Sequence, residues 1–151
     1  RRVRGRGAQD LFPREVSHVT RKWYAHGLRF TCQGSCRCCQ AQQVDTYVFL
    51  TLPDRRRLAA FLGIPTAAFT RRYCARTEDD IHLTHPELDC IFLHKGQCRV
   101  YEARPEQCRT WPFWPENMTE SVWHGEVLPF CAGAGKGRLY SLEEIEKKLR
   151  Q

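Results

Sequence analysis

Four of the nine cysteines lie within eight residues near the start of the chain, as Cys32, Cys36, Cys38 and Cys39. Adjacent residues such as Cys38 and Cys39 rarely form a disulfide, which needs Cα atoms about 4.4–6.8 Å apart. An odd cysteine count also disfavours a disulfide framework. A tight loop can instead direct several thiolates at one cation, because Zn–S bonds are only about 2.3 Å long. The spacing therefore predicts a metal site, with a disulfide framework and unpaired core cysteines as the alternatives.

A second group of cysteines, Cys90, Cys98 and Cys108, follows further along the chain. Apolar stretches flank Lys95-Gly96, which predicts a hairpin that brings the first two cysteines together. A short helix with Pro105 in its first turn is expected to carry the third. Because a helix N-terminus has partial positive charge, we expect it to lower the thiol pKa of Cys108. This group thus offers three more converging ligands.

The segments that carry the cysteines resemble, in order, those of the YkgJ family of cysteine-cluster proteins, whose CxxCxxCC-type domain is described as chelating zinc or iron. The resemblance spans roughly residues 23–149 and rests on several separate motifs: Gly27 to Cys32, Cys38-Cys39, Cys90 to Leu93, Cys98 to Tyr101, Arg104-Pro105, Cys108 to Phe113, Cys131 to Gly137 and Ser141 to Ile145. It implies metal chelation but no particular reaction.

The chain departs from the family pattern at one position. The family has its second cysteine three residues after the first, where this chain has Ser35, and Cys36 follows instead. Either Cys36 substitutes through a shifted loop, or one site has a ligand fewer.

Eight cysteines in or beside family-like positions are the predicted metal ligands: Cys32, Cys36, Cys38, Cys39, Cys90, Cys98, Cys108 and Cys131. Eight thiolates suffice for two tetrahedral zinc sites, or for one 4Fe-4S cluster and one zinc. A single site with the other cysteines packed beside it is the third arrangement. Thiolates favour zinc or iron over magnesium or calcium, and zinc is preferred because small four-thiolate domains more often hold it. The ninth, Cys74, is expected to be a buried core thiol.

Few other side chains suggest chemistry. His94 and His124 are further candidate ligands, and the aromatic segment from Trp111 to Pro115 is expected to cover the metal site and exclude water. No acid–base pair for hydrolysis and no glycine-rich nucleotide loop is present, so no catalytic or cofactor-binding residue is predicted. No small-molecule substrate is identified.

The predicted fold class is α+β, a small irregular metal-stabilised domain with short strands, a hairpin and several short helices. Thr51 and Gly63 predict the start and end of one helix, and Ser141 with Glu144 predicts a capping box at the start of the last. Further helices are expected over residues 14–22 and 65–73, strands over residues 23–31 and 44–50, a loop over residues 76–89, and a turn over residues 133–137.

Residues 1–22 are predicted to form a basic arm and residues 23–151 the metal-binding domain. The chain has 24 basic and 17 acidic residues, and most of the basic ones are arginine, which makes bidentate contacts with phosphate and carboxylate. The arm is therefore expected to contact a larger protein or ribonucleoprotein assembly, such as an organellar complex or a ribosome. A genome-wide arginine bias is the alternative explanation of the composition.

The sequence also favours certain locations. No run of about 20 apolar residues is present, so no membrane span is expected, and no secretory signal is visible. An arginine-rich start without an initiator Met fits a removed organellar transit peptide, and it also fits a simple truncation. A mitochondrial or chloroplast location is therefore expected, with the cytoplasm as the alternative.

Together these features favour a non-catalytic, metal-stabilised accessory subunit. An iron–sulfur or redox-active accessory enzyme and an RNA-binding protein are the alternatives.

Overall fold

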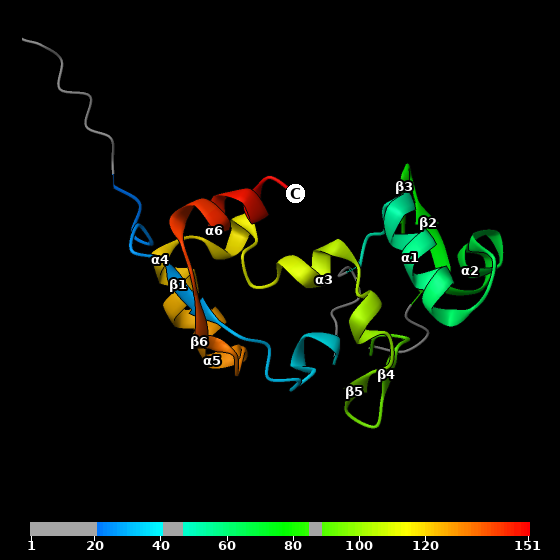
Figure 1. Ribbon diagram of the computed structural model, residues 1–151, viewed down its shortest axis with the longest axis horizontal. Coiled ribbons are helices and arrows are strands. Elements are labelled where there is room, and N and C mark those ends of the chain that lie inside the picture. Colours follow the sequence, from blue (N-terminus) through cyan, green and yellow to red (C-terminus); the bar gives the residue numbers. More distant parts are fainter. Residues whose placement is uncertain (1–20, 41–46, 85–88) are drawn as a thin grey trace, which may run out of the picture.

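The computed structural model describes residues 21–40, 47–84 and 89–151. Figure 1 shows two groups of elements on either side of the short helix α3 (Glu106–Thr110). One group comes from the two ends of the described chain: β1 (Leu28–Phe30), β6 (Ala134–Tyr140) and α6 (Leu142–Leu149), with a helical stretch of α4 (Glu120–Val122), the π turn η4 (Trp123–Val127) and α5 (Leu128–Phe130). The other comes from the middle: α1 (Leu52–Leu62), α2 (Thr66–Tyr73), β2 (Cys74–Thr77) and β3 (Asp80–Leu83).

The first group is held together by the antiparallel pair β1 and β6, in which Leu28 lies opposite Tyr140. Its core contains buried side chains from the whole group: Tyr24, Phe113, Trp123, Val127, Ala134 and Ile145. Two glycines permit the close approach of the strands. A Cβ on Gly133 would lie 2.2 Å from the carbonyl oxygen of Thr31, and one on Gly137 would lie 2.1 Å from its Oγ1. Larger residues at these positions would separate β6 from the chain after β1.

The second group is built on a well-capped helix. The Thr51 hydroxyl accepts from the Asp54 backbone N–H, the Asp54 carboxylate accepts from the Thr51 N–H, and Gly63 ends α1 with φ 68°. A second core forms between this helix, α2 and the cysteine-bearing segments, and includes Leu58, Phe69, Phe92 and Val100.

The cysteine-bearing segments lie between the two groups. They comprise the 3-10 turn η1 (Arg37–Cys39), the hairpin of β4 (Leu93–His94) and β5 (Gln97–Cys98), and α3. The 3-10 turn η2 (Tyr101–Ala103) connects the hairpin to α3, and the 3-10 turn η3 (Pro115–Asn117) follows α3. Figure 1 places η1, drawn in cyan, below α3 and beside the hairpin.

The α+β class, the short strands and the helices begun by Thr51 and Ser141 are confirmed. The helix predicted over 65–73 is confirmed as α2, and the hairpin at Lys95-Gly96 as β4 and β5. Metal stabilisation and the division into arm and domain stay predictions. The helix predicted over 14–22 lies almost entirely outside the described residues. None of the described helices has both the length and the apolar character that a membrane span requires.

Four predicted elements were wrong in whole or in part. The loop predicted over residues 76–89 contains a hairpin, because β2 and β3 pair from Cys74 opposite Leu83 to Thr77 opposite Asp80. The strand predicted over 23–31 begins with a turn and is regular only in β1, while the segment predicted as a turn over 133–137 belongs largely to β6. In the strand predicted over 44–50, residues 44–46 lie outside the described residues, and residues 47–50 bond to β3 but form only an isolated bridge.

Candidate metal centre

Three cysteines from two distant segments form the centre of the site. Cys38 and Cys39 belong to η1, and their sulfur atoms lie 4.0 Å apart, far beyond the S–S bond of about 2 Å in a disulfide. The backbone N–H of Cys90 donates to the Cys39 carbonyl oxygen at 2.8 Å, and the thiol of Cys39 also hydrogen-bonds the Cys90 sulfur. The backbone contact therefore brings the sulfurs of both segments together.

These three thiols share protons unequally. Hydrogen bonds to Cys38 and then to Cys90 raise the pKa of Cys39, so this thiol keeps its proton and acts as the donor. The same hydrogen bonds lower the pKa of Cys38 to about 7 and that of Cys90 to about 7, although burial opposes both shifts. Near neutral pH two of the three sulfurs are therefore readily deprotonated, which is the form that binds metal ions.

Cys108 lies beside this trio, and its thiol chemistry differs from the prediction. Burial, followed by the charges of Cys90 and Cys38, raises the pKa of Cys108 to about 12. The predicted lowering by the helix N-terminus was wrong. Cys108 is the third residue of the five-residue helix α3, and the small dipole of so short a helix does not offset the desolvation of a buried thiolate. A cation close to the sulfur is what would make its thiolate stable here.

Cys36 and Cys98 form a further pair next to the trio. Cys36 is buried and has a left-handed backbone, with φ 54°, which is uncommon for a residue other than glycine. Cys98, on β5, has its pKa raised by burial, and the charges of Cys90 and Cys36 raise it further. The backbone turn at Cys36 thus directs its side chain inward, so the shifted position in the sequence still delivers a thiol to the cluster.

The other two predicted ligands contact other residues. Cys32 is exposed and hydrogen-bonds the hydroxyl of Tyr101. Cys131 accepts a hydrogen bond from the indole N–H of Trp111 at 3.4 Å. Trp111 also packs edge-on against Trp114, with ring centroids 4.8 Å apart. The aromatic segment from Trp111 to Pro115, which was predicted to cover the metal site, therefore contacts Cys131 through Trp111.

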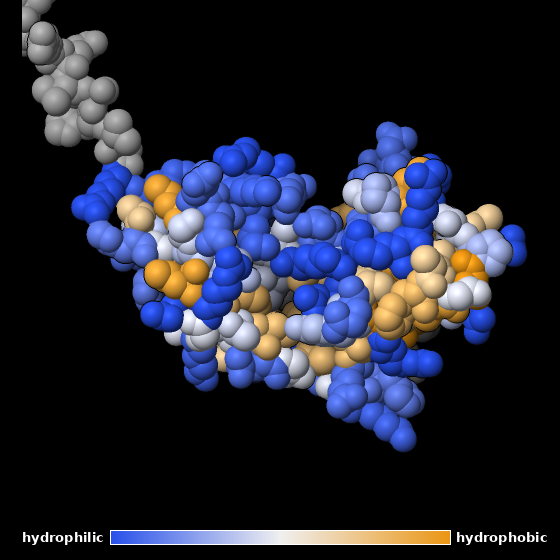
Figure 2. All heavy atoms as spheres, viewed as in Figure 1, coloured by the Kyte–Doolittle hydropathy of each residue, from blue (hydrophilic) through white to orange (hydrophobic). Residues whose placement is uncertain are grey.

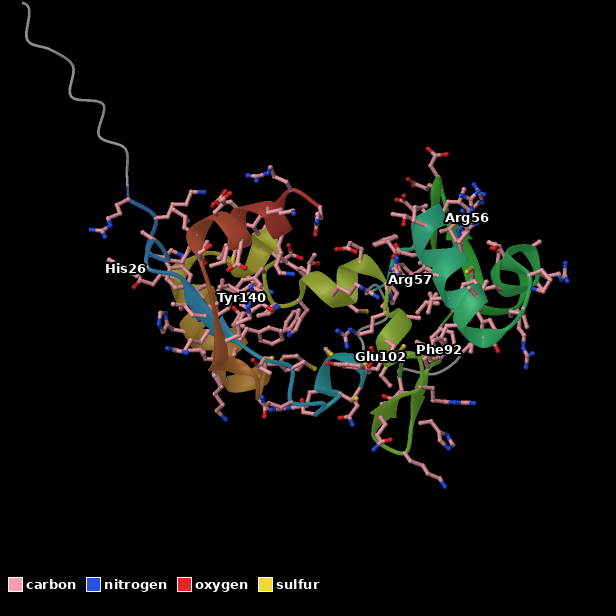
Figure 3. The ribbon with its side chains drawn as sticks, in the orientation of Figure 1. His26, Arg56, Arg57, Phe92, Glu102 and Tyr140 are labelled. Atoms are coloured by element: carbon pink, nitrogen blue, oxygen red, sulfur yellow. The ribbon has the colours of Figure 1, made fainter. Side chains whose placement is uncertain are left out.

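Arg104 is a neighbour of the cluster that sequence reasoning did not identify. Its guanidinium lies over the ring of Tyr101, 3.5 Å from the centroid, and interacts electrostatically with Cys38, Cys98 and Cys108. Its Nε and Nη1 atoms are buried without a hydrogen-bond partner. The Arg104-Pro105 motif of the family pattern was the sequence feature that could have identified this residue. The carbonyl oxygen of Arg104 accepts from Arg57, which extends from α1 toward the middle of the molecule in Figure 3.

The remaining candidates are not part of this cluster. The Nδ1 atom of His124 lies 2.9 Å from the Glu120 carbonyl oxygen, and its ring packs on Trp23 within the group that contains β1 and β6. His94 is exposed on β4. Cys74 begins β2 and packs half-buried on the second core, and burial raises its pKa, as expected of a core thiol.

All nine cysteines carry free thiols. Six of them interact with one another across η1, β5, α3 and the segment before β4: Cys36, Cys38, Cys39, Cys90, Cys98 and Cys108. Within the described part of the chain no three His, Cys, Asp or Glu side chains are already arranged as a ligand set. The chemistry of the donors nevertheless fits zinc or iron, because soft thiolates select these metals.

Comparison with known families agrees with the metal-chelating chemistry expected of these cysteines. Residues 31–132 match the family model CxxCxxCC, described as a zinc- or iron-chelating domain. The match covers more than half of the chain. The chain belongs to this family. The matched region begins one residue before Cys32 and ends one residue after Cys131, so it includes all nine cysteines of the chain. No solved structure matches the chain.

The match is narrower than the resemblance predicted over residues 23–149. It contains η1, the hairpin β4–β5 and α3, and it leaves out all of β1, β6 and α6. The CxxCxxCC domain of this chain is thus packed against elements from both ends of the described sequence.

Proposed function

We propose that this protein binds one zinc ion through the thiolates of Cys38, Cys39, Cys90 and Cys108. The contact between Cys39 and Cys90 carries the proposal, because it joins two cysteine motifs of the family at their sulfur atoms. Cys108 completes the set because it interacts with both Cys38 and Cys90. Bound zinc supplies a structural crosslink, since a closed four-thiolate site leaves no position for water or substrate.

The spacing of Cys38 and Cys39 favours a single cation over a four-iron cluster. Two thiolates on one tetrahedral zinc ion lie about 3.8 Å apart, given Zn–S bonds of about 2.3 Å, and the observed separation is 4.0 Å. In a four-iron cluster each thiolate binds a different iron, which separates the sulfurs further. A lone tetrahedral iron has similar geometry, so elemental analysis is required to distinguish it from zinc.

Charge also supports this ligand set. Four thiolates exceed the charge of one divalent cation by two, and burying such an anion needs a compensating group. Arg104 provides a permanent positive charge that interacts with two of the four sulfurs, Cys38 and Cys108. Cys36 and Cys98 lie next to this set of four ligands. Cys32 and Cys131 stay predicted ligands, and they would be needed only if the protein binds a second ion.

Elemental analysis of the purified full-length chain tests the proposal. We expect about one zinc per chain and a colourless protein. Cys39→Ser and Cys108→Ser should each reduce the zinc content at least severalfold, because both remove a ligand. Cys74→Ser is the matched control and should keep its zinc. Full zinc content in Cys39→Ser would overturn the site, and an absorption band near about 400 nm with stoichiometric iron would favour the iron–sulfur alternative.

We further propose that the protein is a non-catalytic accessory subunit of a larger assembly. This second proposal rests on the sequence alone, because most of the basic arm lies outside the described residues. Four of the first seven residues of the arm are arginine. Deletion of residues 1–20 should abolish co-purification with the partner while leaving the zinc content unchanged. Equal recovery of the partner with the deleted chain would refute the role of the arm. The organellar location also stays a prediction.

A further inference from the structure

A groove of about 460 Å³ separates α3 from the C-terminal elements. Arg104 and Arg109 line it on the α3 side, and Arg138, Lys147 and Lys148 line it on the side of β6 and α6. Figure 2 shows mainly hydrophilic atoms where α6 and α3 face each other. Five cationic side chains therefore surround one hollow, and three of them lie outside the region that matches the family.

The two carboxylates in the groove leave most of this charge unbalanced. Glu144 is occupied within its own element, because it accepts from the Ser141 backbone N–H as part of the capping box and forms an ion pair with Arg138. Glu106 is the other acidic residue in the lining. Arg104 interacts with the cysteine sulfurs. Once Arg104 and the pair of Arg138 and Glu144 are set aside, three cations face one carboxylate. These side chains thus give the groove a net charge of about +2, enough to attract an anion at short range.

Arg109 is held in place without being neutralised. Its Nε donates to the Arg104 carbonyl oxygen and its Nη2 to the Glu102 carbonyl oxygen, both at 2.8 Å. Carbonyl oxygens orient the guanidinium but carry no net charge, and Arg109 forms no ion pair with any described carboxylate. A cation whose orientation is already fixed loses little entropy when it binds an anion.

Lys147 and Lys148 approach from the opposite wall. They lie in the last turn of α6, where the helix dipole by itself favours cations, so the lysines alone do not mark a site. Arg109 faces them from a different element, and no helix dipole explains its position. Lys148 also lies over the ring of Tyr140, 5.6 Å from its centroid, and Figure 3 shows Tyr140 between β6 and α3.

We propose that this groove binds a small phosphate-bearing ligand through Arg109, Lys147 and Lys148. Phosphate suits the site because it carries up to two negative charges and accepts bidentate hydrogen bonds from arginine. The size of the groove suits a small molecule. Single-stranded RNA would require a basic track over many nucleotides and free aromatic faces, and Tyr140 already has Arg138 and Lys148 over its ring.

Calorimetric titration of the zinc-loaded full chain with inorganic pyrophosphate tests the proposal. We expect saturable binding that weakens at least about tenfold in Lys147→Gln/Lys148→Gln and in Arg109→Gln, since each variant removes charge-assisted contacts. The matched control, Arg56→Gln/Arg71→Gln, removes two exposed charges from α1 and α2 and should bind pyrophosphate like the wild type. Zinc content should be unchanged in the lysine variant, because Lys147 and Lys148 lie on α6, outside the cysteine-bearing segments.

Three results would overturn the proposal. The first is no binding of pyrophosphate at millimolar concentration. The second is an equal loss of affinity in the control variant, which would indicate general attraction to a basic protein. The third is tighter binding of a ten-nucleotide single-stranded RNA whose affinity depends on Arg56 and Arg71 as much as on the lysines, which would indicate an extended nucleic-acid surface. These outcomes do not depend on which metal the cysteines bind.

Discussion

The backbone N–H of Cys90 donates to the carbonyl oxygen of Cys39 at 2.8 Å, and the thiols of the same two residues are hydrogen-bonded. This double contact joins the N-terminal cysteine cluster to the hairpin that carries Cys98. A metal ion at this point would hold together segments that are distant in sequence. The stability of the protein should therefore depend on the ion.

Removal of zinc by a chelator should destabilise the middle of the molecule. A ligand at about a thousandfold its dissociation constant stabilises the native state by about 4 kcal/mol, and binding of zinc is coupled to folding. We expect a clear fall in the thermal midpoint measured by circular dichroism, reversed by added zinc and not by added magnesium. An unchanged midpoint after complete removal of zinc would contradict a structural role for the ion.

Replacement of Arg104 should weaken metal binding without removing a ligand. Arg104→Gln takes away the positive charge that interacts with Cys38, Cys98 and Cys108. Groups that support metal ligands typically change affinity about 10–100-fold, so we expect at least about tenfold weaker zinc binding in a competition assay. Arg104→Lys should recover part of the loss, and Arg71→Gln on α2 should behave like the wild type. Wild-type affinity in Arg104→Gln would exclude the electrostatic role.

Asp54 should make stability depend on acidic pH. Burial by itself raises the pKa of Asp54, but hydrogen bonds from Thr51, Glu106 and Arg57 outweigh it and hold the pKa below its ordinary value of 3.8. The ionised carboxylate therefore stabilises the fold fully above about pH 4, and this contribution is lost as the pH falls through the lower, folded-state pKa.

Asp54→Asn should cost about 1–3 kcal/mol at neutral pH, because it breaks an ion pair in which Asp54 is buried and Arg57 is partly exposed. The difference between wild type and variant in urea unfolding should shrink as the pH is lowered from 6 toward about 3. Asp80→Asn, at an exposed position on β3, is the control and should change stability by less than about 0.5 kcal/mol. A pH-independent difference would show that Asp54 does not act through its charge.

Gly133→Ala should disrupt the pairing of β1 with β6. The added Cβ would lie 2.2 Å from the Thr31 carbonyl oxygen, and a backbone atom cannot move aside cheaply. We expect a loss of about 1–3 kcal/mol in the free energy of unfolding. Gly125→Ala, where no atom lies within 4 Å of the new Cβ, should be neutral or slightly stabilising. Equal effects of the two substitutions would refute the steric explanation.

Local features of the fold could be predicted from the sequence. The helix start at Thr51, the capping box at Ser141, the helix end at Gly63 and the turn at Lys95-Gly96 are all confirmed. Each of these features depends on contacts between residues that are only a few positions apart, so the residue types and their spacing are enough to predict it. The polar hairpin of β2 and β3 was missed because the segment lacks the regular apolar alternation that normally indicates strands.

The sequence by itself determined that this protein is a cysteine-rich α+β domain suited to zinc or iron, because thiolate spacing and metal preference are local chemistry. Only the tertiary structure decided which cysteines meet. It joined Cys39 to Cys90, turned Cys36 inward toward Cys98, and buried Cys108 so that its pKa rises where a fall was expected. It also placed Arg109 opposite Lys147 across one groove. These relationships depend on long-range packing and desolvation, and no spacing along the chain specifies either.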